Sequence, residues 1–437
     1  MPVRFRTSLA FTVAALLFAV AAWAREMPTA TPDEVGLSTE RLIRIGQVFK
    51  NEIDQGKLPG AVMLVARKGK IAYFESLGVQ SKDSGQAMPK NAIFRIYSMT
   101  KPIVSVAAMI LAEEGKLQLN DPVGKFLPGF DKLQVSAAKT DAEFAKVAYT
   151  TVPTDRPMTV QDLLRHTSGL AYGELTANTP VKDAYTKAGL WSADMDFDIR
   201  ALTPAEEIER LAKAPLAHQP GTVWEYSFAT DVLGRVVEAA SGMRLADFLA
   251  ERVFKPLGMD DTGFWVPADK ISRLAQPFAT DPATNKPNKL IDVSAQPKND
   301  SGGAGGVSTA LDYLRFSQML LNGGQLDGAR IVSRTTVNLM TSDHLGKRIT
   351  AATTPGELLL GTPGYTFGLG FAVREGAGVA SVPGSAGEFM WGGYGGTYFW
   401  IDPQEQLVGV LMTQAPGPSR QFYRRLFKQL VYQAIAD

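Results

Sequence analysis

The chain has no cysteine among its 437 residues, which excludes disulfide bonds, thiol nucleophiles, cysteine metal sites and a lipid anchor on cysteine. Histidine is almost as scarce, since only His166, His218 and His344 occur. A transition-metal site is therefore not expected, and a serine–histidine–aspartate triad would have to use one of these three side chains. The glycine-rich nucleotide-binding fingerprints are also missing, so we expect neither a metal nor an organic cofactor.

An excess of charge of one sign is missing too. The chain has 45 basic and 44 acidic residues and a formal charge of +1. Such a balance offers no basic surface for nucleic acid or for an anionic membrane. Hydrophobic residues make up 45% and charged residues 20% of the chain, as in ordinary globular proteins. The expected partner is therefore a small molecule, and the composition predicts nothing about the oligomeric state.

Residues 1–24 have the pattern of a signal peptide. Arg4 and Arg6 precede an uncharged apolar run from Leu9 to Ala22, and Ala22-Trp23-Ala24 has small residues at the positions that a signal peptidase reads. The run is shorter than the roughly 20 residues of a membrane span, so cleavage is favoured over an uncleaved anchor. We therefore expect a periplasmic or secreted protein with no stable membrane anchor after cleavage.

Strand patterns lie at both ends of the remaining chain, residues 25–437, and helical patterns lie between them. Two strands are expected at 60–66 and 71–78, and further strands near the C-terminus at 365–374, 388–394, 397–402 and 406–413. Amphipathic helices are expected after Ser38 and at 420–435. Together these patterns predict an α+β fold, in which an antiparallel β-sheet is flanked by terminal helices and a mainly helical domain is inserted between its strands.

The inserted, mainly helical lobe is expected to span residues 137–300, and the α/β lobe to combine residues 25–136 and 301–437. Helical patterns in the middle of the chain occur at 159–166, 204–213 and 229–254. Residues 276–300, rich in Pro, Asn and Lys, have the composition of a linker. A cleft between two such lobes is a usual place for a small-molecule site.

Ser98-Met99-Thr100-Lys101 opens a strongly apolar stretch that is typical of a helix ending at Gly115. Residues three apart share a helix face, so the Lys101 amine can reach the Ser98 hydroxyl. A serine hydroxyl is a weak nucleophile that needs such a base, and a lysine can serve if its pKa is lowered. The spacing alone is a weak signal. Ser136 and Lys139 repeat it without an apolar helix, and a helix-capping serine followed by a surface lysine is the alternative.

From Val35 to the C-terminus the sequence resembles the superfamily of serine β-lactamases and penicillin-binding proteins. Within it, the chain is most similar to the class C β-lactamase-like branch and to the family VIII carboxylesterases. The order and spacing of six stretches carry the resemblance: SMTK at 98–101, LNDPVGKFLP at 119–128, TVQDLLRHTSGL at 159–170, WEYSFATDVLG at 224–234, GGAGGVSTALDYLRF at 302–316 and WGGYGGTYFWIDP at 391–403. The resemblance implies that residues 25–437 form one serine hydrolase domain.

The resemblance also implies roles for individual residues. Ser98 would be the acylated nucleophile, Lys101 would accept its proton, and Tyr226 would pass a proton between Ser98 and the leaving group. Which of Lys101 and Tyr226 deprotonates the serine stays open. The backbone N–H groups of Ser98 and Tyr394 would form the oxyanion hole. Asp231 is given no catalytic role and is expected to cap a helix or to hold the loop of Tyr226.

Two departures from the β-lactamase pattern bear on the substrate. Phe228 stands where β-lactamases carry an asparagine, and Trp391-Gly392-Gly393 stands where they carry Lys-Thr-Gly. An asparagine amide and a lysine would bind the amide and carboxylate groups of a β-lactam, whereas Phe228 and Trp391 leave such polar groups unpaired. We expect Phe228, Trp391, Gly392 and Gly393 to contact the substrate, and the aromatic character favours a neutral ester.

Three functions remain in competition. The first is a serine hydrolase that forms an acyl-enzyme on Ser98 and acts as a carboxylesterase on small esters, with a small amide as a variant substrate. The second is a β-lactamase or D-Ala-D-Ala carboxypeptidase that uses the same machinery. The third is a non-catalytic, penicillin-binding-like module that binds cell-wall peptides, because a fold alone does not establish an activity.

Overall fold

The computed structural model describes residues 26–141, 146–192 and 198–437. The predicted signal peptide, residues 1–24, lies outside the described residues, so its cleavage and the export of the protein stay predictions. None of the helices in the described part has the length and apolarity that crossing a membrane requires.

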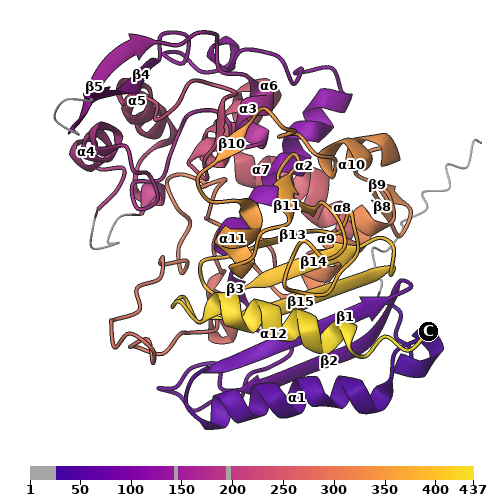
Figure 1. Cartoon of the computed structure of the whole chain (residues 1–437). Coiled ribbons are helices and arrows are strands. Elements are labelled where there is room, and N and C mark those ends of the chain that lie inside the picture. The colour runs from indigo at the N-terminus through magenta and orange to yellow at the C-terminus, as the bar shows by residue number, and fades with distance from the viewer. Residues whose placement is uncertain (1–25, 142–145, 193–197) are drawn as a thin grey trace, which may run out of the picture.

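A seven-stranded sheet forms the centre of the α/β part (Figure 1), with the order β11-β12-β13-β14-β15-β1-β2. All neighbouring pairs are antiparallel, and the N-terminal hairpin joins the C-terminal strands where Ala61 pairs with Thr413. The strands are β1 Gly60–Arg67, β2 Lys70–Gly78, β11 Tyr365–Phe367, β12 Ala372–Arg374, β13 Phe389–Gly392, β14 Tyr398–Asp402 and β15 Leu407–Thr413. The predicted α+β class with an antiparallel sheet is confirmed.

Helices cover both faces of this sheet. Helices α1 (Thr39–Asp54) and α12 (Arg420–Tyr432) lie side by side on one face (Figure 1), and the Phe49 and Phe427 rings meet at 6.1 Å. Helix α9 (Ala310–Leu321) lies on the other face. Successive residues of a strand point to opposite faces, and so Trp400 of β14 packs on α12 while Phe399 packs on α9. All eight residues of β1 are therefore buried, as expected for a strand that is covered on both sides.

The remaining elements form the mainly helical part and the connections around it. Helix α2 (Thr100–Glu113) is apolar on nearly all sides and packs against α6 (Ala229–Ser241). The other helices are α3 Val160–Leu164, α4 Thr179–Lys187, α5 Pro204–Lys213, α7 Leu245–Leu249, α8 Lys255–Leu257, α10 Arg334–Met340 and α11 Pro355–Leu360. The strands outside the seven-stranded sheet are β3 Phe94–Arg95, β4 Gln134–Asp141, β5 Lys146–Pro153, β6 Val223–Trp224, β7 Val307–Ser308, β8 Gln325–Leu326, β9 Ala329–Arg330 and β10 Thr350–Ala351.

The structure differs from the sequence-based expectations at several places. The single strand expected over 365–374 is a hairpin of the two strands β11 and β12. The helix expected over 229–254 is interrupted at Gly242, whose left-handed φ of 72° ends α6. The β4–β5 hairpin was not expected. The expectation that 276–300 is a linker is wrong, because Arg95 donates to the Ile291 carbonyl at 2.7 Å, Val293 is fully buried, and the segment packs onto the body of the protein.

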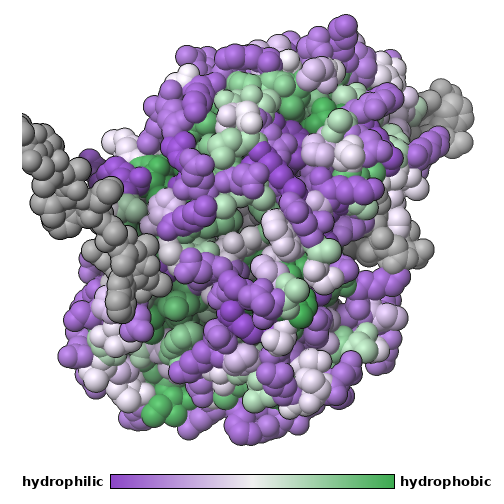
Figure 2. All heavy atoms as spheres, turned by 180° about the vertical axis from the view of Figure 1, so that it is seen from behind, coloured by the Kyte–Doolittle hydropathy of each residue, from purple (hydrophilic) through white to green (hydrophobic). Residues whose placement is uncertain are grey.

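The surface offers few apolar side chains. Figure 2 shows the face opposite to that of Figure 1, where apolar side chains form separate patches among hydrophilic ones. Large hydrophobic side chains that are exposed in the described part are Ile43, Leu175, Ile271, Leu339, Val379 and Phe422. Most apolar side chains of the described part therefore lie in the core or line the cleft.

A buried ionic cluster joins the sheet to α12. Glu388 precedes β13 and accepts hydrogen bonds from Lys428 Nζ at 2.6 Å, from Tyr432 Oη at 2.9 Å and from Tyr365 Oη at 2.5 Å. The side chains of Glu388 and Lys428 are both fully buried. An ion pair at such a site is costly to desolvate and depends on these extra hydrogen bonds.

Replacing Glu388 by alanine is expected to lower the free energy of unfolding by about 3–5 kcal/mol, because it leaves the ammonium of Lys428 buried without its counter-charge. Urea unfolding monitored by circular dichroism measures the change. The control is Asp54→Ala, which breaks the exposed Lys50–Asp54 pair (2.6 Å) and should leave the unfolding midpoint nearly unchanged. Equal shifts for the two variants would show that the buried cluster does not stabilise the fold in this way.

Candidate active site

Ser98 lies at the bottom of a cleft of about 800 Å³ between the sheet and the helical part. Its turn, Tyr97–Met99, directly precedes α2. Tyr97 has a φ of +44°, a left-handed conformation that is strained for a residue with a side chain. Three contacts hold it there: its hydroxyl accepts from Ile291 N at 3.0 Å, its carbonyl accepts from Thr100 Oγ1 at 2.6 Å, and its ring packs on Tyr394 at 5.4 Å. The strained turn thereby presents Ser98 to the cleft.

Lys101 follows on the first turn of α2 and is almost completely buried, with 1% exposure. Its Nζ donates to the Gly303 carbonyl at 2.8 Å and to Tyr172 Oη at 3.1 Å. The same atom lies 4.5 Å from the centroid of the Tyr226 ring. These contacts fix the position of the Lys101 amine, which lies three residues after Ser98 at the start of the helix.

Tyr226 lies on the connection between β6 and α6 and lines the cleft. Three rings surround its own: His166 at 5.0 Å, Tyr172 at 5.2 Å and Trp391 at 5.3 Å. Its buried hydroxyl has no hydrogen-bond partner among the described residues. Hydrogen bonds that take part in catalysis often form only once a substrate is bound, so this free phenol remains available for the serine and the substrate.

Tyr172 is a site residue that sequence reasoning missed. It follows the stretch 159–170, lines the cleft and accepts the hydrogen bond from Lys101, a contact that spans 71 residues of chain. Burial raises the pKa of Tyr172 well above its usual range, and the negative charge of Asp231 adds to this, so the phenol stays neutral. The signal that could have found it is the resemblance itself, had the stretch been extended by two residues.

Asp231 holds the loop that supplies the acceptor for Lys101. It lies in the first turn of α6, and its Oδ1 accepts from Ser301 Oγ at 2.6 Å and from Gly303 N at 3.0 Å. A Cβ on Gly303 would lie 2.2 Å from Asp231 Oδ2, so only glycine fits beside this carboxylate. Asp231 therefore braces the glycine loop rather than the loop of Tyr226.

The end of β13 lies against the turn of Ser98. A Cβ on Gly393 would lie 2.3 Å from the Ile96 carbonyl, and one on Gly392 would lie 2.9 Å from Arg424 Cζ, so both positions require glycine for close approach. Both glycines and Tyr394 line the cleft beside Ser98. The backbone N–H groups of Ser98 and Tyr394 donate to no other group of the described residues. Two free donors therefore flank the serine, as an oxyanion hole requires.

Trp391 differs from the expectation that it contacts the substrate. Its side chain is fully buried and does not line the cleft, because consecutive strand residues point to opposite sides. Instead, its indole packs against the rings of Tyr226 and Phe367, at 5.3 Å from each. Trp391 therefore supports Tyr226 from behind.

Phe228 does line the cleft. It precedes α6, and its ring packs on Tyr172 at 4.6 Å and on Tyr185 at 5.7 Å. The position thus presents an aromatic face to the cleft, with no group that could hydrogen-bond to an amide.

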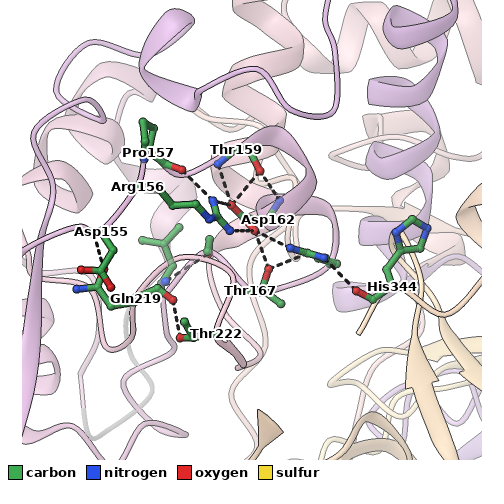
Figure 3. A network of polar contacts seen from close by, with 12 residues as sticks. Asp155, Arg156, Pro157, Thr159, Asp162, Thr167, Gln219, Thr222 and His344 are labelled. Atoms are coloured by element: carbon green, nitrogen blue, oxygen red, sulfur yellow. Dashed lines mark hydrogen bonds and ion pairs between the residues drawn. The ribbon is translucent and has the colours of Figure 1, made fainter. Parts of the chain in front are cut away.

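The three histidines serve the structure around the site, and none hydrogen-bonds to Ser98. His166 Nδ1 lies 3.2 Å from Ser227 Oγ, and burial, followed by the charge of Lys101, lowers the pKa of His166 well below its usual range. Its turn is held by Asp162, which accepts hydrogen bonds from Arg156 and Thr167 (Figure 3). Within the described residues, no group of histidine and carboxylate side chains could hold a metal ion.

The chain is similar to known proteins over most of its length. Residues 45–433 match the sequence profile described as Beta-lactamase. The chain belongs to the β-lactamase family.

Relatives within this family include esterases. Protein Rv1367c of Mycobacterium tuberculosis is 36% identical over 372 residues, covering 83% of this chain and 87% of the relative. Esterase EstB of Burkholderia gladioli is 33% identical over 392 residues, covering 85% of this chain and 89% of the esterase. The solved structure of EstCE1, described as a hydrolase with promiscuous acyltransferase activity, is 28% identical, has a TM-score of 0.71, and covers 90% of this chain and 99% of that chain. This member of the β-lactamase family is a serine hydrolase.

Replacing Asp231 by alanine is expected to lower kcat by about ten- to a hundredfold with a smaller change in KM, because the Gly303 carbonyl would no longer hold Lys101 in place. Steady-state kinetics on a p-nitrophenyl ester measure kcat and KM separately. Asp231→Asn, which keeps one acceptor oxygen, serves as the conservative control and should recover part of kcat. A wild-type kcat for Asp231→Ala would show that the loop does not position the lysine.

Proposed function

We propose that this β-lactamase-family hydrolase is a carboxylesterase that acts on small esters through an acyl-enzyme on Ser98. The observation that carries the proposal is the aromatic wall of the cleft, where Phe228 stands in place of an amide side chain. Amide-containing substrates would lose a hydrogen bond there, whereas an ester loses nothing. The sequence identity of 33% with esterase EstB, over most of both chains, supports the same substrate class.

The geometry supports the following steps. The hydroxyl of Ser98 attacks the ester carbonyl, and its proton passes to Lys101 or Tyr226, whose side chains lie together beneath the cleft. The N–H groups of Ser98 and Tyr394 bind the oxyanion that develops on the carbonyl oxygen. Tyr226 delivers the proton to the departing alcohol, and a water molecule then hydrolyses the acyl-enzyme. Tyr172 keeps Lys101 oriented and accepts no proton itself, because its raised pKa keeps the phenol protonated.

The second candidate is a β-lactamase or D-Ala-D-Ala carboxypeptidase. The family membership of the chain favours it, since the same nucleophile and oxyanion hole would open a β-lactam ring. A non-catalytic peptide-binding module is the third. It is disfavoured because Ser98 and Tyr226 line one cleft and Lys101 Nζ lies 4.5 Å from the Tyr226 ring, an arrangement that binding alone would not require.

A paired hydrolysis assay on the purified protein tests the proposal. We expect rapid turnover of a short-chain p-nitrophenyl ester, much slower turnover of a chromogenic cephalosporin, and loss of both activities in Ser98→Ala. Thermal unfolding of Ser98→Ala controls for folding. Dominant cephalosporin turnover would favour the β-lactamase function and would show that Phe228 does not exclude amide-containing substrates. If the folded protein hydrolyses neither compound, the non-catalytic peptide-binding module becomes the favoured function.

The two cleft tyrosines should respond differently to removal of the hydroxyl. Tyr226→Phe is expected to lower kcat by about 10²- to 10⁴-fold, because it removes the group that transfers the proton. Tyr172→Phe keeps the ring and loses only one hydrogen bond to Lys101, so we expect less than about a tenfold loss. Steady-state kinetics on the same ester compare them. A larger loss for Tyr172→Phe would exchange the roles of the two residues.

A further inference from the structure

Two arginines of helix α12 line the cleft beside the proposed oxyanion hole. Arg420 is the first residue of the helix, and its guanidinium lies 5.1 Å from the centroid of the Tyr394 ring. Its Nη1 donates to the Pro416 carbonyl at 2.6 Å. These two contacts fix the orientation of the guanidinium and leave its other N–H groups without a hydrogen-bond partner among the described residues. Arg424 lies one turn later and also reaches the cleft.

The two arginines differ from the other arginine of the cleft, Arg200. Arg200 pairs with Asp198 at 2.8 Å. Neither Arg420 nor Arg424 forms an ion pair with a carboxylate of the described residues. Arg424 donates to the carbonyls of Gly393 at 2.6 Å and Leu359 at 3.1 Å, and its buried Nε has no partner there. Glu174, Asp198, Asp231 and Asp292 also line the cleft, but none of them forms an ion pair with Arg420 or Arg424. The two guanidinium groups are therefore largely buried without a carboxylate in direct contact, at a cost that a bound anion would offset.

The titration behaviour of the two groups agrees with this geometry. Burial lowers the pKa of Arg420, and the phenols of Tyr394 and Tyr226 are the neighbours that act against it. Burial, followed by the charge of Arg420, lowers the pKa of Arg424 to about 9. Both arginines are therefore close enough to Tyr226 for its phenol to affect their pKa, and Arg424 is also affected by the charge of Arg420. An anion bound here would lie next to the reacting ester group.

We propose that Arg420 binds a carboxylate of the substrate, so that the preferred esters are acidic ones, such as half-esters of dicarboxylic acids or esters of a hydroxy acid. Arg424 holds Gly393 and adds positive charge behind Arg420. The inference rests on the proposed esterase function and revises the expectation of a neutral ester. That expectation followed from the missing asparagine and lysine of the two motifs and from the aromatic residues in their place, whereas the cation here comes from α12.

Two pairs of esters of matched shape test the proposal. In the first pair, the acyl chain ends in either a carboxylate or a methyl ketone: p-nitrophenyl hydrogen adipate is compared with p-nitrophenyl 6-oxoheptanoate. In the second pair, the carboxylate or the ketone is on the leaving group: 3-carboxyphenyl butyrate is compared with 3-acetylphenyl butyrate. We expect kcat/KM for the acid to exceed that for the ketone by about tenfold or more in one of the pairs, as a charge-assisted hydrogen bond predicts.

Variants of α12 locate the effect. Arg420→Gln should lower this acid-to-ketone ratio by about tenfold, and Arg420→Lys should restore part of it. Arg425→Gln removes the same charge from the same helix at a residue outside the cleft lining, and should keep the ratio. An equal loss for acid and ketone in Arg420→Gln would show that Arg420 acts on the catalytic groups and would overturn the proposal.

The remaining outcomes separate this inference from the proposed function. Hydrolysis of the ketone esters with no preference for either acid would overturn the anion site and leave the esterase proposal standing. If no ester is hydrolysed, the esterase proposal fails, and calorimetric binding of the same esters to Ser98→Ala decides the inference. Tighter binding of the acid would support the site, and equal binding would overturn it.

Discussion

The hydrogen bond from Lys101 Nζ to the Gly303 carbonyl is the contact on which the rest of the site depends. It joins the helix that follows Ser98 to the glycine loop before β7. That loop is also fixed by Asp231 of α6 and by Thr100 of α2, whose Oγ1 accepts from Gly306 N at 2.9 Å. A buried ammonium is tolerated only where such acceptors surround it. The same contacts therefore allow the lysine to be buried and fix the position of its amine beside the Tyr226 ring.

The cleft exists because three chain segments can approach one another without side chains between them. Gly303 meets the carboxylate of Asp231, Gly393 meets the Ile96 carbonyl, and Gly306 meets the Thr100 hydroxyl, each too closely for a Cβ. These glycines bring the glycine loop, the end of β13 and the turn of Ser98 together. Each segment is anchored to a different layer of the fold, so packing of the sheet and packing of α2 against α6 both set the geometry of the site.

The sequence predicted the parts of this arrangement that leave local or ordered signals. The antiparallel sheet followed from strand patterns at both ends of the chain, and Ser98, Lys101 and Tyr226 followed from motifs whose order resembles a known superfamily. Tyr172 was missed because its contact with Lys101 depends on how α2 and the turn after α3 pack. Residues 276–300 were misjudged because polar, proline-rich composition is shared by linkers and by loops held through their backbone groups. The inward direction of Trp391 depended on the strand register, which the motif does not contain.

Arg420 shows that a motif on one strand does not predict the charge of the whole cleft. Three-letter motifs record which residue stands on β13, and there Trp391 replaces a lysine. The potential in a cleft is the sum over all charges near it, whatever element supplies them. Helix α12 places two guanidinium groups against the end of that strand, so the positive charge has moved from the strand to the helix. If Arg420 binds a substrate carboxylate as proposed, the charge of α12 and the aromatic face of Phe228 together select a different set of acyl compounds for the same catalytic groups.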